Sequence, residues 1–108
     1  MKKIEAIIKP FKLEEVKDVL TGMRIHGATV SEVRMQSPQR VHHDLAYGED
    51  FQPKIKLELV VTDEQKNDAV EAILHAAKTG RVGDGRIFVI DIKDAIRIRT
   101  GEHGAEAV

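Results

Sequence analysis

The residues best suited to chemistry gather in the segment 79–88, which reads TGRVGDGRIF. This segment contains three glycines and two arginines, namely Gly80, Gly83, Gly85, Arg81 and Arg86. Glycines spaced in this way let the backbone turn tightly and direct several N–H groups at one point. Arginines beside them match phosphate oxygens in both charge and shape. The segment is therefore predicted to bind a polyphosphate group.

A second arginine pair lies about ten residues further along the chain, in a segment 96–99 that we expect to be extended. Arg97 and Arg99 would then point to one face, because side chains two apart in a strand share a face. The glycine-rich segment is not a Walker A loop, since no Gly-Lys-Ser/Thr follows it. Asp84 would repel phosphate, so we expect it to fix the turn through nearby backbone or to receive an arginine.

No set of residues for catalysis accompanies this anion site. The chain has no cysteine, and it contains neither Ser-x-x-Lys nor Gly-x-Ser-x-Gly. Its carboxylates are scattered among lysines, as on solvated helix faces. We therefore predict a binding protein rather than an enzyme, with a nucleotide-hydrolysing enzyme as an alternative. His42 and His43 beside Asp44 raise a metal hypothesis, but adjacent histidines in an extended loop point apart, so no metal site is assigned.

Length and charge narrow the class of protein further. The chain has 108 residues, which indicates a single domain, and a formal net charge of −1. That charge gives no reason to expect non-specific binding to nucleic acid. The N-terminus lacks the apolar run of a signal peptide, and no apolar stretch approaches the ~20 residues of a membrane helix. We expect a cytoplasmic protein that does not insert into a membrane.

Hydrophobic periodicity predicts alternating strands and helices. We expect strands at 2–8, 28–35, 54–61 and 87–92, with a short fifth strand at 96–99 and a loose tail from residue 101. A first helix should follow Pro10. A second should open with a capping box at Thr62 and Gln65. Its buried stripe is predicted to consist of Val70, Ile73, Leu74 and Ala77. The order is βαββαβ, which implies an α+β domain with an antiparallel sheet and both helices on one face.

Two segments of this sequence carry functional expectations. Residues 36–53 show no period and form a predicted long loop, which in so small a domain is more often functional than idle. In the strand 54–61, Ile55, Leu57, Leu59 and Val61 should face the core, while Lys54, Lys56, Glu58 and Val60 face the other way. An outer face that mixes Val60 with charges suits a subunit contact, so we expect a homo-oligomer.

Three segments, in order and correctly spaced, resemble the PII signal-transduction family of nitrogen regulatory proteins. They are KKIEAIIKPFKL (2–13), which is similar to the family's first strand and helix start, TGRVGDGRIF (79–88), similar to its B-loop, and IRIRTGE (96–102), which covers its C-loop (97–102). The resemblance covers nearly the whole chain. It implies a single domain (1–108) with a ferredoxin-like fold and a compact homotrimer. It also implies ATP or ADP in three clefts between neighbouring subunits.

The resemblance implies a nucleotide site made of Thr29, Lys54, Glu58, Val60, Gly83, Asp84, Gly85, Arg86, Arg97 and Arg99. In this reading Gly83, Gly85 and Arg86 cradle the phosphates, and the arginines of the C-loop reach in from the neighbouring subunit. Lys54 corresponds to a lysine near the phosphates. Thr29, Glu58 and Val60 correspond to positions beside the adenine.

Residues 36–53 match the family's T-loop, which docks into ammonium channels, sensor kinases and metabolic enzymes. Gln39 matches the glutamine that meets Mg²⁺ when ATP and 2-oxoglutarate bind. The family's glycines are replaced at Met35, Ser37 and Val41, and its arginine is replaced by Pro38. About four residues are missing before Phe51, a shortening that removes the modified tyrosine and leaves Tyr47 as a weak substitute.

These departures affect the expected ligands. Val41 and Ser37 resist the positive φ angles that glycine permits. We therefore predict retained ATP or ADP binding, doubtful 2-oxoglutarate binding, and no uridylylation at the usual place. The chain is predicted to sense adenine nucleotides and to regulate a nitrogen-related transporter or enzyme through its T-loop. The alternative is a trimer that responds to metal or another small molecule, as in the related CutA-like proteins, using His42 or His43.

Overall fold

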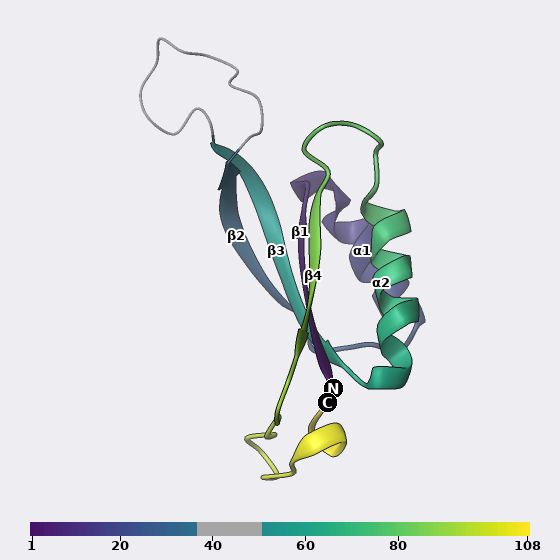
Figure 1. Cartoon of the computed structure of the whole chain (residues 1–108), viewed down its shortest axis with the longest axis vertical. Coiled ribbons are helices and arrows are strands. Elements are labelled where there is room, and N and C mark those ends of the chain that lie inside the picture. The colour runs from purple at the N-terminus through teal and green to yellow at the C-terminus, as the bar shows by residue number, and fades with distance from the viewer. Residues whose placement is uncertain (37–50) are drawn as a thin grey trace.

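A computed structural model describes residues 1–36 and 51–108 of the chain (Figure 1). Its strands form one antiparallel sheet in the order β2-β3-β1-β4, and both helices lie on one face of that sheet. The elements are β1 (Lys2–Ile8), η1 (Pro10–Lys12), α1 (Leu13–Gly22), β2 (Thr29–Gln36), β3 (Phe51–Val61), α2 (Asp63–Ala77), β4 (Gly85–Asp91) and η2 (Gly104–Ala107). The predicted ferredoxin-like βαββαβ order is confirmed.

The core lies between the helices and the two central strands. β1 pairs with β3 on one side and β4 on the other, with Ile4 opposite both Leu59 and Val89. The alternation predicted for β3 holds, since its four apolar side chains are buried. Lys54 is the exception on the other face, because it too is buried, at 7% exposure. Burial of a lysine requires polar partners, and they belong to the candidate site.

The helices cover the sheet with short apolar stripes. Val16 and Leu20 of α1 are buried, as are Ala69, Ile73 and Ala77 of α2. The expectation that Leu74 belongs to this stripe is wrong, because its side chain is 51% exposed. Each helical residue is rotated by about 100° from the one before it, so the residue after Ile73 points away from the core.

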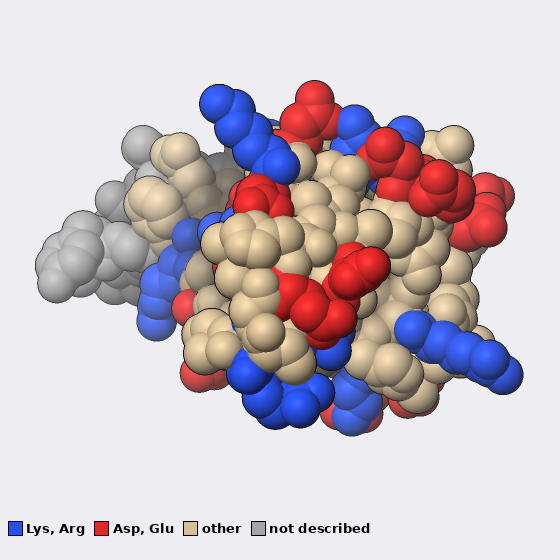
Figure 2. Space-filling model, turned by 90° about the horizontal axis from the view of Figure 1, so that it is seen from below, with Lys and Arg blue, Asp and Glu red and all other residues tan. Residues whose placement is uncertain are grey.

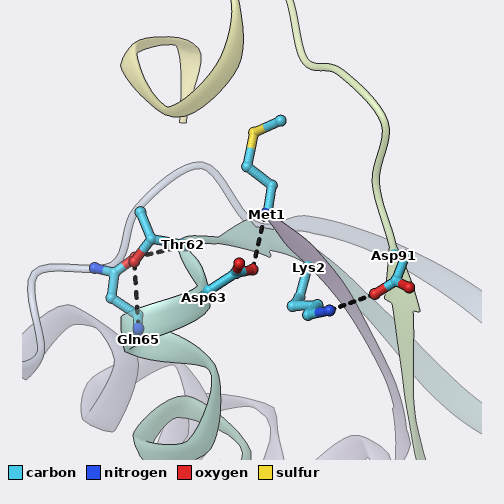
Figure 3. A network of polar contacts seen from close by, with 6 residues as sticks. All are labelled: Met1, Lys2, Thr62, Asp63, Gln65 and Asp91. Carbon is cyan, nitrogen blue, oxygen red and sulfur yellow. Dashed lines mark hydrogen bonds and ion pairs between the residues drawn. The ribbon is translucent and has the colours of Figure 1, made fainter.

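The start of α2 is held by a network near the N-terminus (Figure 3). The predicted capping box is confirmed: the Gln65 amide donates to Thr62 Oγ1 over 3.2 Å, and the Thr62 amide donates to Gln65 Oε1 over 3.1 Å. The amino group of Met1 donates to Asp63 Oδ1 over 2.8 Å, which holds the pKa of that carboxyl below its usual value. Lys2 pairs with Asp91. This end of the sheet therefore ties β1, α2 and β4 together.

Strand boundaries differ from expectation around the long loop. β2 runs through Gln36 and β3 begins at Phe51, so both ends of the predicted loop 36–53 are paired strand. Pro53 is tolerated there because it pairs only with Arg34 of β2, whereas β1 ends at Ile8, opposite Ile55. β4 also starts earlier than predicted, at Gly85, and ends at Asp91.

The expected fifth strand at 96–99 is wrong. These residues form a turn, and the strand-like pairing in it is one isolated bridge between Ile96 and His103. The expectation of a loose tail is wrong as well, since η2 and several hydrogen bonds order residues 101–108. Among the helices that the structure describes, none is both long and apolar enough to cross a membrane.

Candidate functional site

The turn between α2 and β4 depends on glycine. Gly80, Gly83 and Gly85 all have positive φ, at +81°, +89° and +110°. At Gly85 a Cβ atom would lie 1.7 Å from the carbonyl oxygen of Ile7, because β4 meets β1 there. L-residues rarely adopt such φ angles. Glycine is therefore required at the entrance to β4 for both conformation and space.

Asp84 fixes the shape of this turn. Its carboxylate accepts hydrogen bonds from the Thr79 hydroxyl, from the Thr79 amide over 2.9 Å and from the Gly80 amide over 2.8 Å. Its cation is Lys9, 3.2 Å away, where an arginine was an open possibility. The Thr79 hydroxyl, followed by the Thr79 and Gly80 amides and Lys9, holds the pKa of Asp84 well below its usual range. The carboxylate therefore stays ionised and keeps its four partners.

Lys54 lies directly under this turn. Its Nζ donates to the Gly83 carbonyl oxygen over 2.6 Å. Burial lowers the pKa of Lys54, the like charge of Lys9 lowers it further, and Asp84 partly compensates. An anion placed nearby would favour the charged lysine. Sequence reasoning missed Lys9, whose side chain borders Gly83 beside Lys54.

A hollow of about 640 Å³ lies beside Gly83 and Asp84. Its walls are Met35, Gln36, Arg81, Gly83, Asp84, Gly85 and Arg86. We call these residues, together with Lys9 and Lys54, the glycine-loop half of the site. It combines two guanidiniums, two nearby lysines and a glycine backbone, which is the chemistry that phosphate oxygens require. The last residues of β2, Met35 and Gln36, also border it, so the half lies next to the start of the long loop.

Three of the predicted residues lie elsewhere, around a second hollow of about 430 Å³. Thr29 pairs with Glu58 across β2 and β3, and Val60 lines the same hollow. Lys3 forms an ion pair with Glu58 at 2.6 Å, and its hydrogen bond lowers the pKa of that carboxyl. Lys54 and Glu58 share a strand face but lie four residues apart, roughly 13 Å along β3. They therefore serve two different hollows.

Arg97 and Arg99 belong to a compact turn, residues 94–104, which we call the arginine turn. The Arg97 amide donates to the Glu102 carbonyl over 2.9 Å, and the Gly101 amide donates to the Arg97 carbonyl over 2.7 Å. The two guanidiniums are thus presented by a turn, and the strand geometry that predicted their shared face does not apply. Ala95, at the base of this turn, lines the second hollow. We call that hollow and the arginine turn together the arginine half.

The two halves lie at opposite ends of the sheet. The glycine-loop half adjoins the start of β4 at Gly85, and the arginine turn follows its end at Asp91 (Figure 1). A seven-residue strand separates these points by roughly 20 Å. Seen from the arginine-turn end, acidic and basic side chains are interspersed, and neither sign covers the face (Figure 2). One chain therefore cannot place both halves around the same phosphate group.

Several predicted features fall outside the described residues: Gln39, His42, His43 and Tyr47 all lie in the segment 37–50. Within residues 1–36 and 51–108, no group of three or more histidine, aspartate or glutamate side chains could hold a metal ion.

The fold places the chain in a class, the small ferredoxin-like domains, and its glycine-loop half has the chemistry that suits an anionic ligand. The family model described as nitrogen regulatory protein P-II matches residues 1–102. The chain belongs to this family of regulatory proteins.

The chain aligns with curated relatives over their full length. The chain is 53% identical to the nitrogen regulatory protein P-II of Pasteurella multocida (strain Pm70) and 54% identical to that of Rhodospirillum rubrum. It is 52% identical to that of Bradyrhizobium diazoefficiens. Each alignment covers all of both chains. These alignments run over 112 positions, four more than the 108 residues of this chain.

Proposed function

We propose that this protein is a homotrimeric signal-transduction regulator that binds ATP or ADP between subunits and controls a target protein through residues 36–53. The observation that carries this proposal is the division of the site into two halves at opposite ends of one sheet. Each half is incomplete, and each would be completed by the other half of a neighbouring chain. A head-to-tail ring of chains joins such halves by symmetry.

The phosphates would bind in the glycine-loop half. Arg86 and the backbone around Gly83 border its hollow, with Lys54 behind them. The neighbour's Arg97 and Arg99 would close the site from the other side. Charge-assisted hydrogen bonds from guanidinium to phosphate are about twice as strong as neutral ones. Affinity for the phosphates would therefore depend on both subunits.

The adenine would bind in the hollow of the arginine half. Val60 offers an apolar surface, while Thr29 and Glu58 offer polar groups that can meet ring nitrogens and the exocyclic amine. Lys3 holds the Glu58 carboxylate in place. This arrangement would recognise a base rather than a bare polyphosphate.

The sheet face without helices would form the subunit contact. Phe88 and Ile90 on this face are 45% and 40% exposed. Two ion pairs beside them link β1 with β3. Lys3 pairs with Glu58 at 2.6 Å, and Lys56 pairs with Glu5 at 3.1 Å. Apolar side chains rimmed by charge are typical of surfaces that associate.

The glycine-loop half also adjoins the ends of the T-loop. Gln36 lines its hollow, and Phe51 opens the strand that carries Lys54. Nucleotide exchange there would change the position of both loop ends, and the loop would bind or release a nitrogen-related transporter or enzyme. Mg²⁺ would accompany ATP near Gln39, and 2-oxoglutarate would bind weakly because Ser37 and Val41 replace glycines.

Calorimetric titration of the purified protein with ATP, ADP, AMP and Zn²⁺, together with native mass spectrometry, tests this function. We expect a trimer that binds ATP and ADP and loses affinity on Arg86→Ala. A monomer, or no binding of either nucleotide at millimolar concentration, would refute it. Tight Zn²⁺ binding without nucleotide binding would favour the metal-responsive alternative.

A further inference from the structure

We propose that Asp94 and His103 form a clamp that holds the arginine turn in the shape needed to present Arg97 and Arg99. Both would be positioning residues, which act on the ligand through the two arginines. The proposal rests on the proposed nucleotide site and adds to it two residues that sequence reasoning had left without a role.

The clamp closes the base of the turn. Asp94 Oδ1 accepts the Ala95 amide over 2.9 Å and the Gly104 amide over 3.2 Å. Asp94 Oδ2 lies 2.8 Å from His103 Nδ1. The Gly104 amide also donates to the Ala95 carbonyl over 2.9 Å. One carboxylate therefore binds groups on both arms of the turn.

Among the described residues, apolar packing does little to hold the tip of the turn. Ile98, between the two arginines, is 99% exposed, and Ile96 is 58% exposed. Apolar burial therefore does not fix the positions of the arginines. The shape of the turn depends on its polar contacts, among them the bond from the Thr100 hydroxyl to Glu102 Oε1 at 2.8 Å. Loss of the contacts at the base would let the two arms separate.

The carboxylate is the central group of the clamp. The hydrogen bond from His103 lowers the pKa of Asp94, and the amides of Ala95 and Gly104 lower it further. Asp94 thus stays ionised at neutral pH and binds all three groups at once. The contact with His103 alone contributes little, because the His103 and Asp94 side chains are 64% and 48% exposed. The greater part of the effect is expected from the two backbone amides.

The affinity for ADP should fall in proportion to the fraction of molecules in which the arginine turn keeps its binding conformation. We expect Asp94→Ala to weaken ADP binding about five- to tenfold and His103→Ala about two- to threefold. Asp94→Asn keeps an acceptor for the amides and should fall between wild type and Asp94→Ala. The matched control is Glu14→Ala, which removes a carboxylate from an exposed ion pair with Lys17 at 3.0 Å on α1. It should leave ADP affinity unchanged.

Hydrogen exchange tests the clamp without any ligand. Asp94→Ala should speed exchange of the Arg97, Gly101 and Gly104 amides and leave the amides of α1 unchanged. Glu14→Ala should not change exchange in the turn. Unchanged exchange in the Asp94→Ala turn would overturn the proposal.

A double-mutant cycle separates positioning from general destabilisation. The ADP affinity lost through Asp94→Ala is measured in wild type, in Arg97→Ala and in Arg99→Ala. If the clamp acts through these arginines, the fold loss must shrink in at least one arginine variant. An equal loss in all three backgrounds would overturn the positioning role and leave the nucleotide site standing. A wild-type protein that binds no nucleotide would instead overturn the proposed function.

Discussion

Subunits with complementary defects should rebuild nucleotide sites when they are mixed. One variant carries Arg86→Ala, which damages the glycine-loop half, and the other carries Arg97→Ala with Arg99→Ala, which damages the arginine half. Each lost charge-assisted hydrogen bond costs about 1.5–3 kcal/mol, or roughly ten- to a hundredfold in affinity. Both pure trimers should therefore bind ADP poorly. In a head-to-tail ring, every mixed trimer contains one cleft built from two intact halves.

The recovered capacity follows from the geometry. Random assortment of equal amounts makes about three quarters of the trimers mixed, and each regains one cleft of three, so about a quarter of the wild-type sites return. The assay is the calorimetric stoichiometry of ADP after the two variants are denatured and refolded together. The control is the same pair refolded separately and combined without subunit exchange. If the co-refolded mixture regains no tight sites, the two halves do not meet between chains, and the shared cleft is refuted.

Three further predictions concern the glycine-loop half. Gly85→Ala should prevent β4 from docking on β1, because the new Cβ would lie 1.7 Å from the carbonyl oxygen of Ile7. The control is Gly27→Ala, which has φ +84° and no atom within 4 Å of the new Cβ, so it should cost only backbone strain. Thermal unfolding compares the stability of the two variants. Asp84→Asn should destabilise the protein at neutral pH, because a carboxyl with a lowered pKa contributes stability as long as it is ionised. Urea unfolding should show that the difference in unfolding free energy between wild type and variant shrinks below about pH 4, where the carboxyl of the unfolded chain becomes protonated. Lys54→Met should leave the unfolding midpoint unchanged or higher, because it removes a buried charge, while ADP titration shows weakened binding.

Local patterns predicted the parts of the fold that local patterns control. The sequence predicted both the alternation in β3 and the capping box at Thr62, because side-chain period and cap chemistry depend on residues only a few positions apart. The glycine spacing likewise indicated the turn before β4. The sequence did not predict that Lys9 anchors this turn through Asp84. That lysine lies 75 positions before Asp84 in the sequence and is brought near it only by the packing of β1.

The arginine turn shows why a correct pattern can predict the wrong structure. Its apolar and basic residues alternate with period two, which is typical of a strand. A strand also needs a neighbour to pair with, and the segment 96–99 finds none among the described residues of its own chain beyond the Ile96–His103 bridge. Asp94 instead closes the segment on itself. The arginines were therefore identified by residue type, whereas their geometry required the tertiary contacts.

A site divided in this way would also link nucleotide binding to assembly. If each cleft needs groups from two chains, ADP binds the ring and not the separated subunits, so ligand stabilises the trimer by mass action. The same ligand would reach Gln36 on β2 and Lys54 on β3, the two strands on either side of residues 37–50. The contact between subunits and the position of the loop would then both depend on whether nucleotide occupies the cleft. A regulator built in this way can report the nucleotide state to a target without cleaving the nucleotide, because the free energy of binding alone shifts the equilibrium between loop states.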